Sequence, residues 1–301
     1  MKHVVSVSIG SSTRDHSVET EILGEKFRVE RIGTDGDEKK AVELIRSLDG
    51  KVDAIGLGGI DLYLIAGKKR YIIRDAKKLA NAAKKTIVLD GSGMKNTLER
   101  MIIRDLVAEG KYLRKGSKVL LVSAVDRFGM AETLYEKGCD VIFGDFLFAL
   151  GLPIPVKSLV SLRILAAILL PIFTRLPFKM LYPTGSEQTH RKPKFQNYFQ
   201  WAEVIAGDFH FIKRKMPDDL KNKIILTNTV TSKDVEELKT LGASVLITTT
   251  PEFEGRSFGT NVFEGICAAM LGKKKDDMPS EEEYIDLIKK MGFGPRISKL
   301  N

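Results

Sequence analysis

The chain has 301 residues, of which 43% are hydrophobic and 29% are charged, so it is able to bury a substantial core. At this length we expect two domains, because single hydrophobic cores stop growing beyond about 250 residues. The two cysteines, Cys139 and Cys267, argue against a disulfide framework. The amino terminus alternates like a strand and lacks the apolar block of a signal peptide, so we expect a cytoplasmic protein.

The formal net charge of +9 raises the question of nucleic-acid binding. The positive residues are spread as pairs, among them Lys39-Lys40 and Lys77-Lys78, without interleaved aromatic residues or zinc-knuckle spacing. We therefore expect a solvated lysine-rich surface, no nucleic-acid partner, and a small-molecule substrate. The four histidines are scattered, so no metal site is predicted.

The first 112 residues alternate between predicted strands and helices, which indicates an N-terminal α/β domain over 1–112. Strands are predicted over 3–9, over 17–23 and 26–32 as a hairpin, over 51–59, and over 70–75 as a short strand or hairpin arm. Helices are predicted over 37–48 and 75–85, and a strand, a glycine turn and a helix follow over 86–110.

From residue 113 onward, predicted strands and helices alternate more regularly. Strands are predicted over 118–123, 140–144, 203–208, 223–228 and 244–249, with helices over 128–138 and 232–242. This order predicts a Rossmann-like, doubly wound parallel-sheet domain over 113–272, with its ligand crevice at the carboxyl ends of the strands. For residues 273–301 we predict a C-terminal helix and tail. The helix is predicted to begin at a capping box on Ser280, and we expect it to pack back on the first domain.

An insertion over 146–200 interrupts this alternation, and its part 146–182 is strongly apolar. Its apolar core, 159–173, is too short to span a membrane, which takes about 20 apolar residues. Three interpretations remain open: a subunit interface of a homodimer, a lid or wall over an apolar ligand, and a contact with a membrane surface, which we favour least.

The loop after strand 118–123 has the position of a dinucleotide-binding turn. Ser123 and Val125 stand where the first two glycines of the fingerprint would be, Phe128 stands near the third, and Gly129 remains. Asp145 follows the next strand, where a carboxylate binds a ribose hydroxyl and favours NAD over NADP. Two interpretations are open: a bound dinucleotide, or a Rossmann domain that has lost its cofactor. The candidate cofactor-binding residues are Ser123, Ala124, Asp126, Arg127, Phe128, Gly129, Asp145, Thr248 and Thr249.

A second candidate site is the turn DGSGMKN at 90–96. Its glycines free backbone N–H groups at the start of a helix, and Lys95 adds a positive charge, so the turn suits a carboxylate or phosphate. The alternative is a plain turn with a surface lysine. Candidate substrate-binding residues are Gly91, Ser92, Gly93 and Asn96, together with Arg256 from the loop after the last parallel strand. Ser257, Thr260 and Asn261 either bind the ligand or cap a helix that begins near Asn261.

The segments SVSIGSSTRDH, RIGTDGD, VDAIGLGGIDLYL, DGSGMKNTLER and VSAVDRFGMAETLYEKGCDVIFGD resemble those of a bacterial family of quinate 5-dehydrogenases, within the shikimate/quinate 5-dehydrogenase group. The resemblance implies an α/β substrate domain, a nicotinamide-binding Rossmann domain, and a lysine–aspartate pair that moves the hydroxyl proton. Lys95 is placed like that lysine, and Asp105, one helix further on, is the candidate aspartate.

We therefore expect an NAD(P)-dependent oxidoreductase, a dehydrogenase, that acts on a small anionic hydroxy or carbonyl compound with Lys95 and Asp105 as catalytic residues. Two alternatives stay open. One is a reductase of a longer acyl compound, with 146–182 as the apolar wall. The other is a non-catalytic nucleotide- or metabolite-binding protein on a degenerate Rossmann domain.

Overall fold

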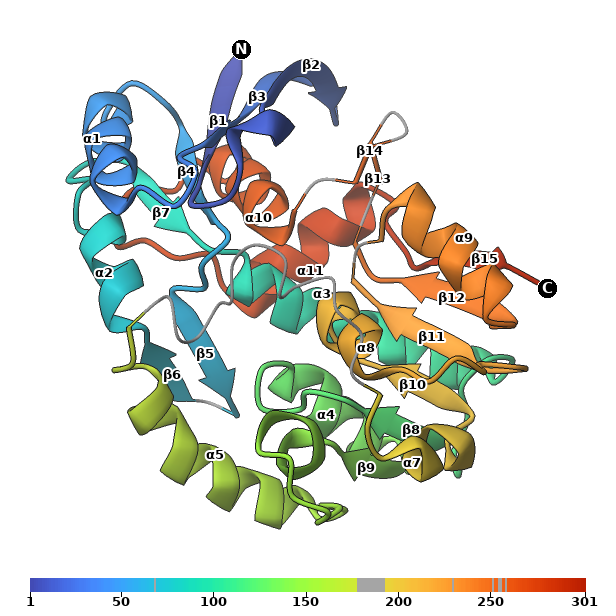
Figure 1. Cartoon of the computed structure of the whole chain (residues 1–301). Helices are drawn as coiled ribbons and strands as arrows, with labels where there is room; N and C mark the ends of the chain where they lie inside the picture. The colour runs from blue at the N-terminus through green and yellow to red at the C-terminus, as the bar shows by residue number, and fades with distance from the viewer. Residues whose placement is uncertain (68, 178–192, 229, 251, 254–255, 258) are drawn as a thin grey trace.

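The computed structural model of the chain describes residues 1–67, 69–177, 193–228, 230–250, 252–253, 256–257 and 259–301. Two sheets with helices on their faces form the molecule, and the predicted α/β class is confirmed (Figure 1). The first sheet has the order β2-β3-β1-β4-β7. Its strands are β1 (Lys2–Ser8), β2 (His16–Ile22), β3 (Glu25–Gly33), β4 (Ala54–Gly58) and β7 (Ile87–Leu89).

The predicted hairpin around Gly24 is confirmed, since β2 and β3 pair antiparallel across a turn in which Leu23 and Gly24 have positive φ. The other strands of this sheet run parallel. Alternate residues of β1 serve opposite faces: Val5 packs towards α1 (Glu38–Leu48) and α2 (Arg74–Ala80), and Val4 packs towards α10 (Thr260–Met270).

The second sheet has the order β15-β12-β11-β10-β8-β9. Its strands are β8 (Lys118–Leu121), β9 (Asp140–Phe143), β10 (Val204–Ala206), β11 (Ile224–Thr227), β12 (Val245–Thr248) and β15 (Arg296–Lys299). Five strands are parallel in the chain order 2-1-3-4-5, and β15 adds an antiparallel edge. The predicted Rossmann-like parallel sheet is therefore confirmed.

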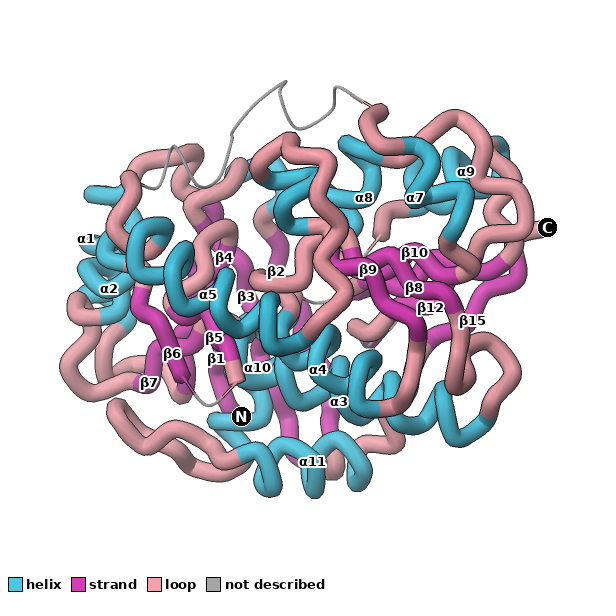
Figure 2. Tube along the Cα trace, turned by 90° about the horizontal axis from the view of Figure 1, so that it is seen from below, coloured by secondary structure: helices cyan, strands magenta, loops and turns pink. Residues whose placement is uncertain are grey.

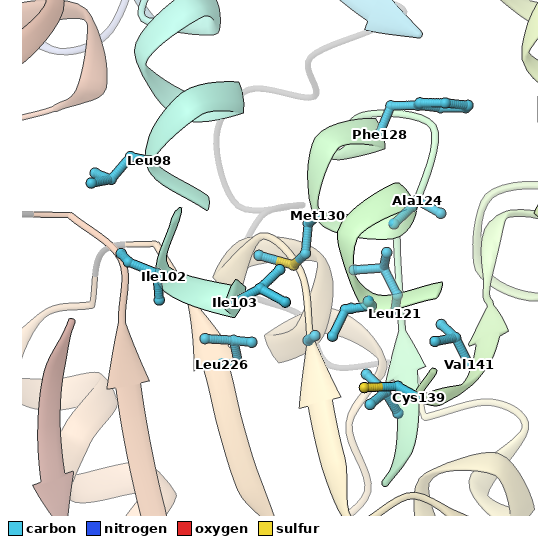
Figure 3. Close-up of a cluster of buried hydrophobic side chains, with 14 of the residues drawn as sticks. Leu98, Ile102, Ile103, Leu121, Ala124, Phe128, Met130, Cys139, Val141 and Leu226 are labelled. Carbon is cyan, nitrogen blue, oxygen red and sulfur yellow. The ribbon is translucent and has the colours of Figure 1, made fainter. Parts of the chain in front are cut away.

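Helices cover both faces of this second sheet. One face carries α3 (Ser92–Glu109), α4 (Phe128–Glu136) and α11 (Glu281–Lys290), and Figure 3 shows Ile102 and Ile103 of α3 close to Leu226 and Leu121 of the strands. The other face carries α7 (Gln196–Trp201), α8 (Phe209–Lys215) and α9 (Ser232–Thr240). The helix α11 begins at the predicted capping box on Ser280 and packs on α3, within the first 112 residues of the chain.

The helix α10, which follows the last parallel strand of the second sheet, lies against the first sheet. We placed residues up to 272 with the Rossmann-like sheet, but α10 packs on β1 and β4 of the first sheet. Gly56 and Gly91 allow this approach, because a Cβ at either position would lie within 3.0 Å of Asn261 backbone atoms at the start of α10. The chain therefore returns to the first sheet after completing the parallel strands of the second.

Smaller elements connect the two parts. Strands β5 (Tyr63–Ala66) and β6 (Lys69–Ile72) form a hairpin beside α3 and α4, so residues 70–72 of the predicted segment 70–75 supply a hairpin arm, and its last two residues begin α2. The remaining short elements are η1 (Ser12–Arg14), the π-helix η2 (Asp145–Ala149), β13 (Glu252–Phe253) and β14 (Arg256–Ser257). Within the insertion, α5 (Leu159–Phe173) lies on the surface (Figure 2). Among the described residues, no helix combines the length and apolarity needed to cross a membrane.

Candidate functional site: a charged pocket between the two sheets

A polar pocket lies where α3 meets the loop that follows β8. It is lined by Tyr63, Ile65, Ser92, Lys95, Asn96, Glu99, Asp126, Arg127, Phe128 and Gly129. Its free volume is about 10 Å³, which is roughly the room that one water needs. The described conformation is therefore closed, and a ligand needs the lining elements to move apart.

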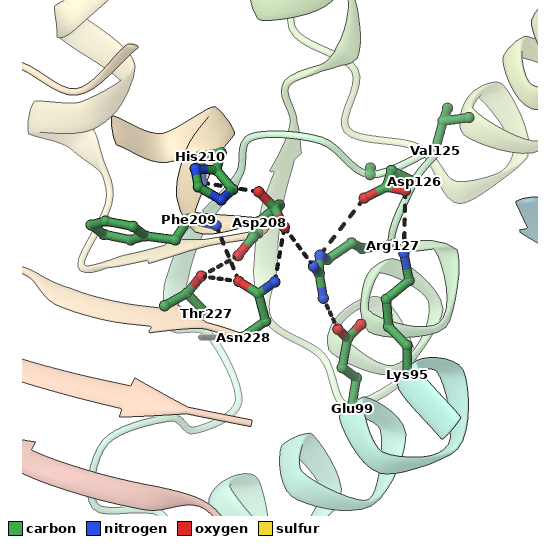
Figure 4. A network of polar contacts seen from close by, with 12 residues as sticks. Lys95, Glu99, Val125, Asp126, Arg127, Asp208, Phe209, His210, Thr227 and Asn228 are labelled. Atoms are coloured by element: carbon green, nitrogen blue, oxygen red, sulfur yellow. Dashed lines mark hydrogen bonds and ion pairs between the residues drawn. The ribbon is translucent and has the colours of Figure 1, made fainter. Parts of the chain in front are cut away.

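Lys95 projects from the first turn of α3 into this pocket (Figure 4). Its Nζ lies 3.3 Å from Oδ1 of Asp126, and only 15% of its side chain is exposed. Burial lowers the pKa of Lys95, but the carboxylates of Asp126 and Asp61 raise it by more, so the net shift is upward. The amine is therefore held as a charged hydrogen-bond donor.

Arg127 connects the elements around the pocket. Its guanidinium is almost fully buried and bonds Glu99 of α3 and, at 2.9 Å, Oδ2 of Asp208 at the start of α8 (Figure 4). Asp208 also accepts from Nδ2 of Asn228, after β11, at 2.9 Å. Burial lowers the pKa of Arg127, but Glu99 and Asp208 raise it by more, so its charge is stable.

One donor of Arg127 is left over. Its Nε is buried, has no hydrogen-bond partner among the described residues, and lies 3.8 Å from Oδ2 of Asp126, beyond hydrogen-bond distance. Nearly all buried polar groups in proteins have a partner, so this donor points to a site that a water or a ligand oxygen completes.

The position of this network follows from the sheet. The chain passes from β8 to β9 on one side and then crosses to β10 on the other side of β8, which makes the gap between β8 and β10 the switch point of the sheet. Open parallel sheets bind ligands in the crevice at the carboxyl ends of the strands at such a point. Asp126 and Arg127 follow β8, and Asp208 follows β10, so they lie at this crevice.

In this structure Asp145 has partners within the protein itself. We expected its carboxylate to bind a ribose, but it is buried and accepts from the backbone N–H groups of Ala124 at 3.2 Å and Val125 at 3.0 Å. Burial raises the pKa of Asp145 to about 6. The carboxylate therefore accepts the hydrogen bonds of the loop N–H groups that would otherwise bind a pyrophosphate, and the described conformation does not fit a dinucleotide there.

Gly129 also serves packing. A Cβ at this position would collide with Oδ1 of Asn96, so the glycine allows α4 to approach α3. Ser123, Ala124 and Phe128 are buried, and Phe128 and Ala124 belong to the hydrophobic cluster under α3.

The predicted anion site at the start of α3 is likewise filled by the protein. Oε2 of Glu264, from α10, accepts from Gly91 N at 2.7 Å, and Oε1 accepts from Met94 N at 3.1 Å and from the Tyr284 hydroxyl at 2.8 Å. Ser92 bonds Asp90, and a Cβ at Gly93 would lie 2.5 Å from Glu264. The helix N-terminus is therefore capped from within and is not free for a substrate anion.

The remaining candidates are separated from the pocket. Asp105 is exposed on α3, about 15 Å along the helix from Lys95, so Asp126 and not Asp105 is the partner of Lys95. Thr248 and Thr249 are buried at the end of β12. Arg256 lies in β14, and its side chain falls outside the described part of the structure.

Sequence reasoning missed Glu99, Asp208, Asn228 and Glu264. Asp208 and Asn228 each follow a strand at its carboxyl end, a signal that we applied to the strands over 118–123, 140–144 and 244–249 but not to the two strands between them. Glu99 and Glu264 sit inside helices, where their spacing gives no signal. Among the described residues, no group of three or more His, Cys, Asp or Glu side chains is placed to hold a metal ion.

Two family models match the chain, and the description of each is a domain of unknown function. A family model described as "Domain of unknown function (DUF8754)" matches residues 93–300, and one described as "Domain of unknown function (DUF8753)" matches residues 3–90. No curated protein matches the chain.

Solved structures match over nearly the whole chain at low similarity. A galactofuranose binding protein has 12% identity and a TM-score of 0.34, with 97% of this chain and 100% of that chain covered. A periplasmic ribose ABC transporter from Conexibacter woesei has 9% identity and a TM-score of 0.37, with 96% and 94% covered. An NAD-dependent malic enzyme from Thermotoga maritima has 12% identity and a TM-score of 0.37, with 96% and 84% covered.

Proposed function

The chain belongs to the DUF8754 family, whose description assigns no activity, and from the geometry of its pocket we propose that it binds a small hydroxylated metabolite between its two sheets. The observation that carries this proposal is the buried Nε of Arg127, a donor without a hydrogen-bond partner among the described residues, at the switch point of the parallel sheet. An oxygen of the ligand accepts from this donor.

The charges of the pocket support a hydroxylated ligand. Lys95 and Arg127 are its cations, and Glu99, Asp126 and Asp208 are the carboxylates bonded to them. Hydroxyl groups accept from the cations and donate to the carboxylates, so a compound with several hydroxyls satisfies both. Within the pocket lining, Lys95 and Arg127 are matched by the two carboxylates of Glu99 and Asp126, and this balance favours a neutral compound over the anionic substrate that the sequence predicts.

Access to the pocket requires movement, because its present volume admits about one water. The hairpin β5–β6 carries Tyr63 and Ile65 over the pocket and packs on α3, α4 and α5. Displacement of this hairpin from α3 opens the pocket without breaking either sheet.

Calorimetric titration with neutral polyols and sugars, and with hydroxy acids including quinate and shikimate, tests the proposal. We expect a neutral compound to bind most tightly, and Lys95→Gln to weaken that binding about tenfold or more, because a hydrogen bond to a charged group contributes about 1.5–3 kcal/mol. The matched control is Lys289→Gln on the exposed side of α11, which should leave affinity unchanged. Equal losses in the two variants, or no binding across the panel, would contradict the proposal.

A second candidate is an NAD(P)-dependent oxidoreductase of the quinate/shikimate 5-dehydrogenase type. The pairing of Lys95 with Asp126 inside the pocket favours it, because a lysine–aspartate pair is what the sequence resemblance implies. A protonated Lys95 would donate a proton or a hydrogen bond to a substrate oxygen. The nicotinamide cofactor would supply hydride chemistry when bound, but its pyrophosphate requires a loop conformation in which Asp145 releases Ala124 and Val125.

Fluorescence titration with NADH and NADPH separates the two candidates. Saturable binding together with turnover of a hydroxy acid, lowered about a hundredfold by Lys95→Gln, would establish the oxidoreductase. If a hydroxylated compound binds and neither NADH nor NADPH does, the oxidoreductase is ruled out and metabolite binding is the function that remains.

A further inference from the structure

The helix α5 presents an apolar stripe to solvent. Val160, Ile164, Ile168 and Ile172 recur every four residues and are 63%, 57%, 60% and 55% exposed. The opposite side of the helix, with Leu162, Ala166 and Leu170, is buried against the molecule. Single exposed apolar residues are ordinary, but a continuous row of four marks a surface that binds something.

The loop that leads into α5 extends this surface. Leu150, Leu152 and Ile154 are 41%, 43% and 51% exposed. Figure 2 shows this loop and α5 on the same face of the molecule, the one turned towards the viewer. We call the seven residues of the stripe and the loop together the α5 face.

Basic side chains surround the α5 face. Lys157 and Arg163 are 57% and 54% exposed, Arg175 follows the end of α5 and is exposed, and Arg74 lies beside it through a backbone hydrogen bond to Thr174. Arg163 and Lys157 keep these exposures although they contact Glu132 and Asp140. The sequence has no Asp or Glu from residue 146 to residue 186.

We propose that the α5 face binds an anionic lipid surface, with the helix lying in the plane of the membrane interface. An exposed apolar stripe with Lys and Arg beside it is the pattern of helices that lie at membrane interfaces. Anionic headgroups supply the negative charge that the segment itself lacks, and each Lys or Arg near such a surface adds to the attraction.

The same charges disfavour a second copy of the chain, the occupant that the sequence ranked first. A twofold contact brings a patch against itself, so Arg163 beside Ile164 would face the cations of its partner. Glu132 is the ion-pair partner of both Arg163 and Arg100, so one carboxylate does not neutralise the two cations, and burial of the remaining like charges against each other opposes association. A lipid surface covers the apolar stripe without this repulsion.

Flotation of the full chain with vesicles tests the proposal. We expect it to float with vesicles of phosphatidylcholine and phosphatidylglycerol in equal parts, much less with phosphatidylcholine alone, and less as salt is raised. Ile164→Glu/Ile168→Glu should lower binding at least about tenfold, because it removes two apolar anchors and adds negative charge. Lys157→Gln/Arg175→Gln should reduce the preference for phosphatidylglycerol and its dependence on salt.

The matched control is Leu23→Glu, an exposed apolar residue in the β2–β3 hairpin, at the opposite side of the molecule in Figure 1, which should float like the unmodified chain. Circular dichroism of each variant establishes that it is folded. The proposal would be overturned if the chain floated equally well with and without phosphatidylglycerol. It would also be overturned if the folded Ile164→Glu/Ile168→Glu variant floated as well as the unmodified chain. A third outcome would also overturn it: the chain does not float, it forms a concentration-dependent dimer, and the Ile164→Glu/Ile168→Glu variant is monomeric. The α5 face would then be a subunit interface.

Discussion

Glu264 shows how a single buried carboxylate stabilises the junction of three helices. It is 1% exposed and accepts from the start of α3 and from Tyr284 of α11, while it belongs to α10. Burial and the nearby Asp90 raise the pKa of Glu264 to about 7, against an ordinary value of 4.5. The three hydrogen bonds lower it, but by less than burial raises it.

The raised pKa of Glu264 predicts a pH dependence of stability. Between pH 4.5 and about 7 the folded protein holds a proton that the unfolded chain has released, so the free energy of unfolding falls as pH rises through this window. The loss amounts to about 3 kcal/mol at most. Glu264→Gln should flatten this slope, measured by urea unfolding at several pH values.

Asp145 adds a slope of the same sign between pH 3.8 and about 6, so part of the dependence should remain in the Glu264→Gln variant. The control is Glu281→Gln, on the exposed first turn of α11. An unaltered slope above pH 6 in Glu264→Gln would show that Glu264 is ionised throughout.

At the scale of elements, the crossing of α3 and α4 places both the pocket and the core. Lys95 and Glu99 lie on the side of α3 that faces the pocket. Leu98 and Ile102 lie in the buried hydrophobic cluster between α3 and the second sheet. The two helices meet at Gly129, where a Cβ would collide with Oδ1 of Asn96. A small change at this crossing therefore alters packing and pocket together.

Gly129→Ala should destabilise the protein by about 1–3 kcal/mol, because the added methyl group has no room beside the Asn96 side chain, which must leave its position next to Arg100. Thermal unfolding measures the loss. Combination with Asn96→Ala should recover part of it, since the colliding oxygen is then gone. Gly294→Ala, where nothing lies within 4 Å of the new Cβ, is the control, and an equal loss there would contradict the steric explanation.

At the scale of the whole molecule, the two sheets are tied together by helices that the chain order separates. The helix α3 follows a strand of the first sheet and packs on the second, and α10 follows the second sheet and packs on the first. Val262, Ile266 and Ala269 of α10 cover one face of β1, β4 and β7. Neither sheet therefore has a complete core within one continuous segment.

A fragment of residues 1–112 should not fold on its own, although it contains the whole first sheet. Without α10, the face that carries Val4, Phe27 and Leu89 is left in water. We expect the circular dichroism signal of the fragment to change gradually on heating, whereas that of the full chain should show a cooperative unfolding transition under the same conditions. Cooperative unfolding of the fragment would mean that α10 is dispensable for the first sheet.

The sequence by itself determined the elements and the class of the fold. Alternating apolar residues, glycine turns and the Ser280 capping box are local signals, and they predicted the β2–β3 hairpin, the parallel strands and α11. They also placed Lys95 at the start of a helix, because a strand and a glycine turn directly precede it. Each of these features depends on residues close together in the chain.

Only the tertiary structure decided which groups meet. Asp145 fills the loop that resembled a pyrophosphate site, and Glu264 fills the helix start 173 residues before it, so two predicted anion sites are occupied by the protein's own carboxylates. Asp126, not Asp105, pairs with Lys95, and Arg127 gathers Glu99 and Asp208 from other elements. The reason is physical: a free backbone donor attracts any carboxylate that packing brings near, and packing joins segments whose distance along the chain carries no local signal.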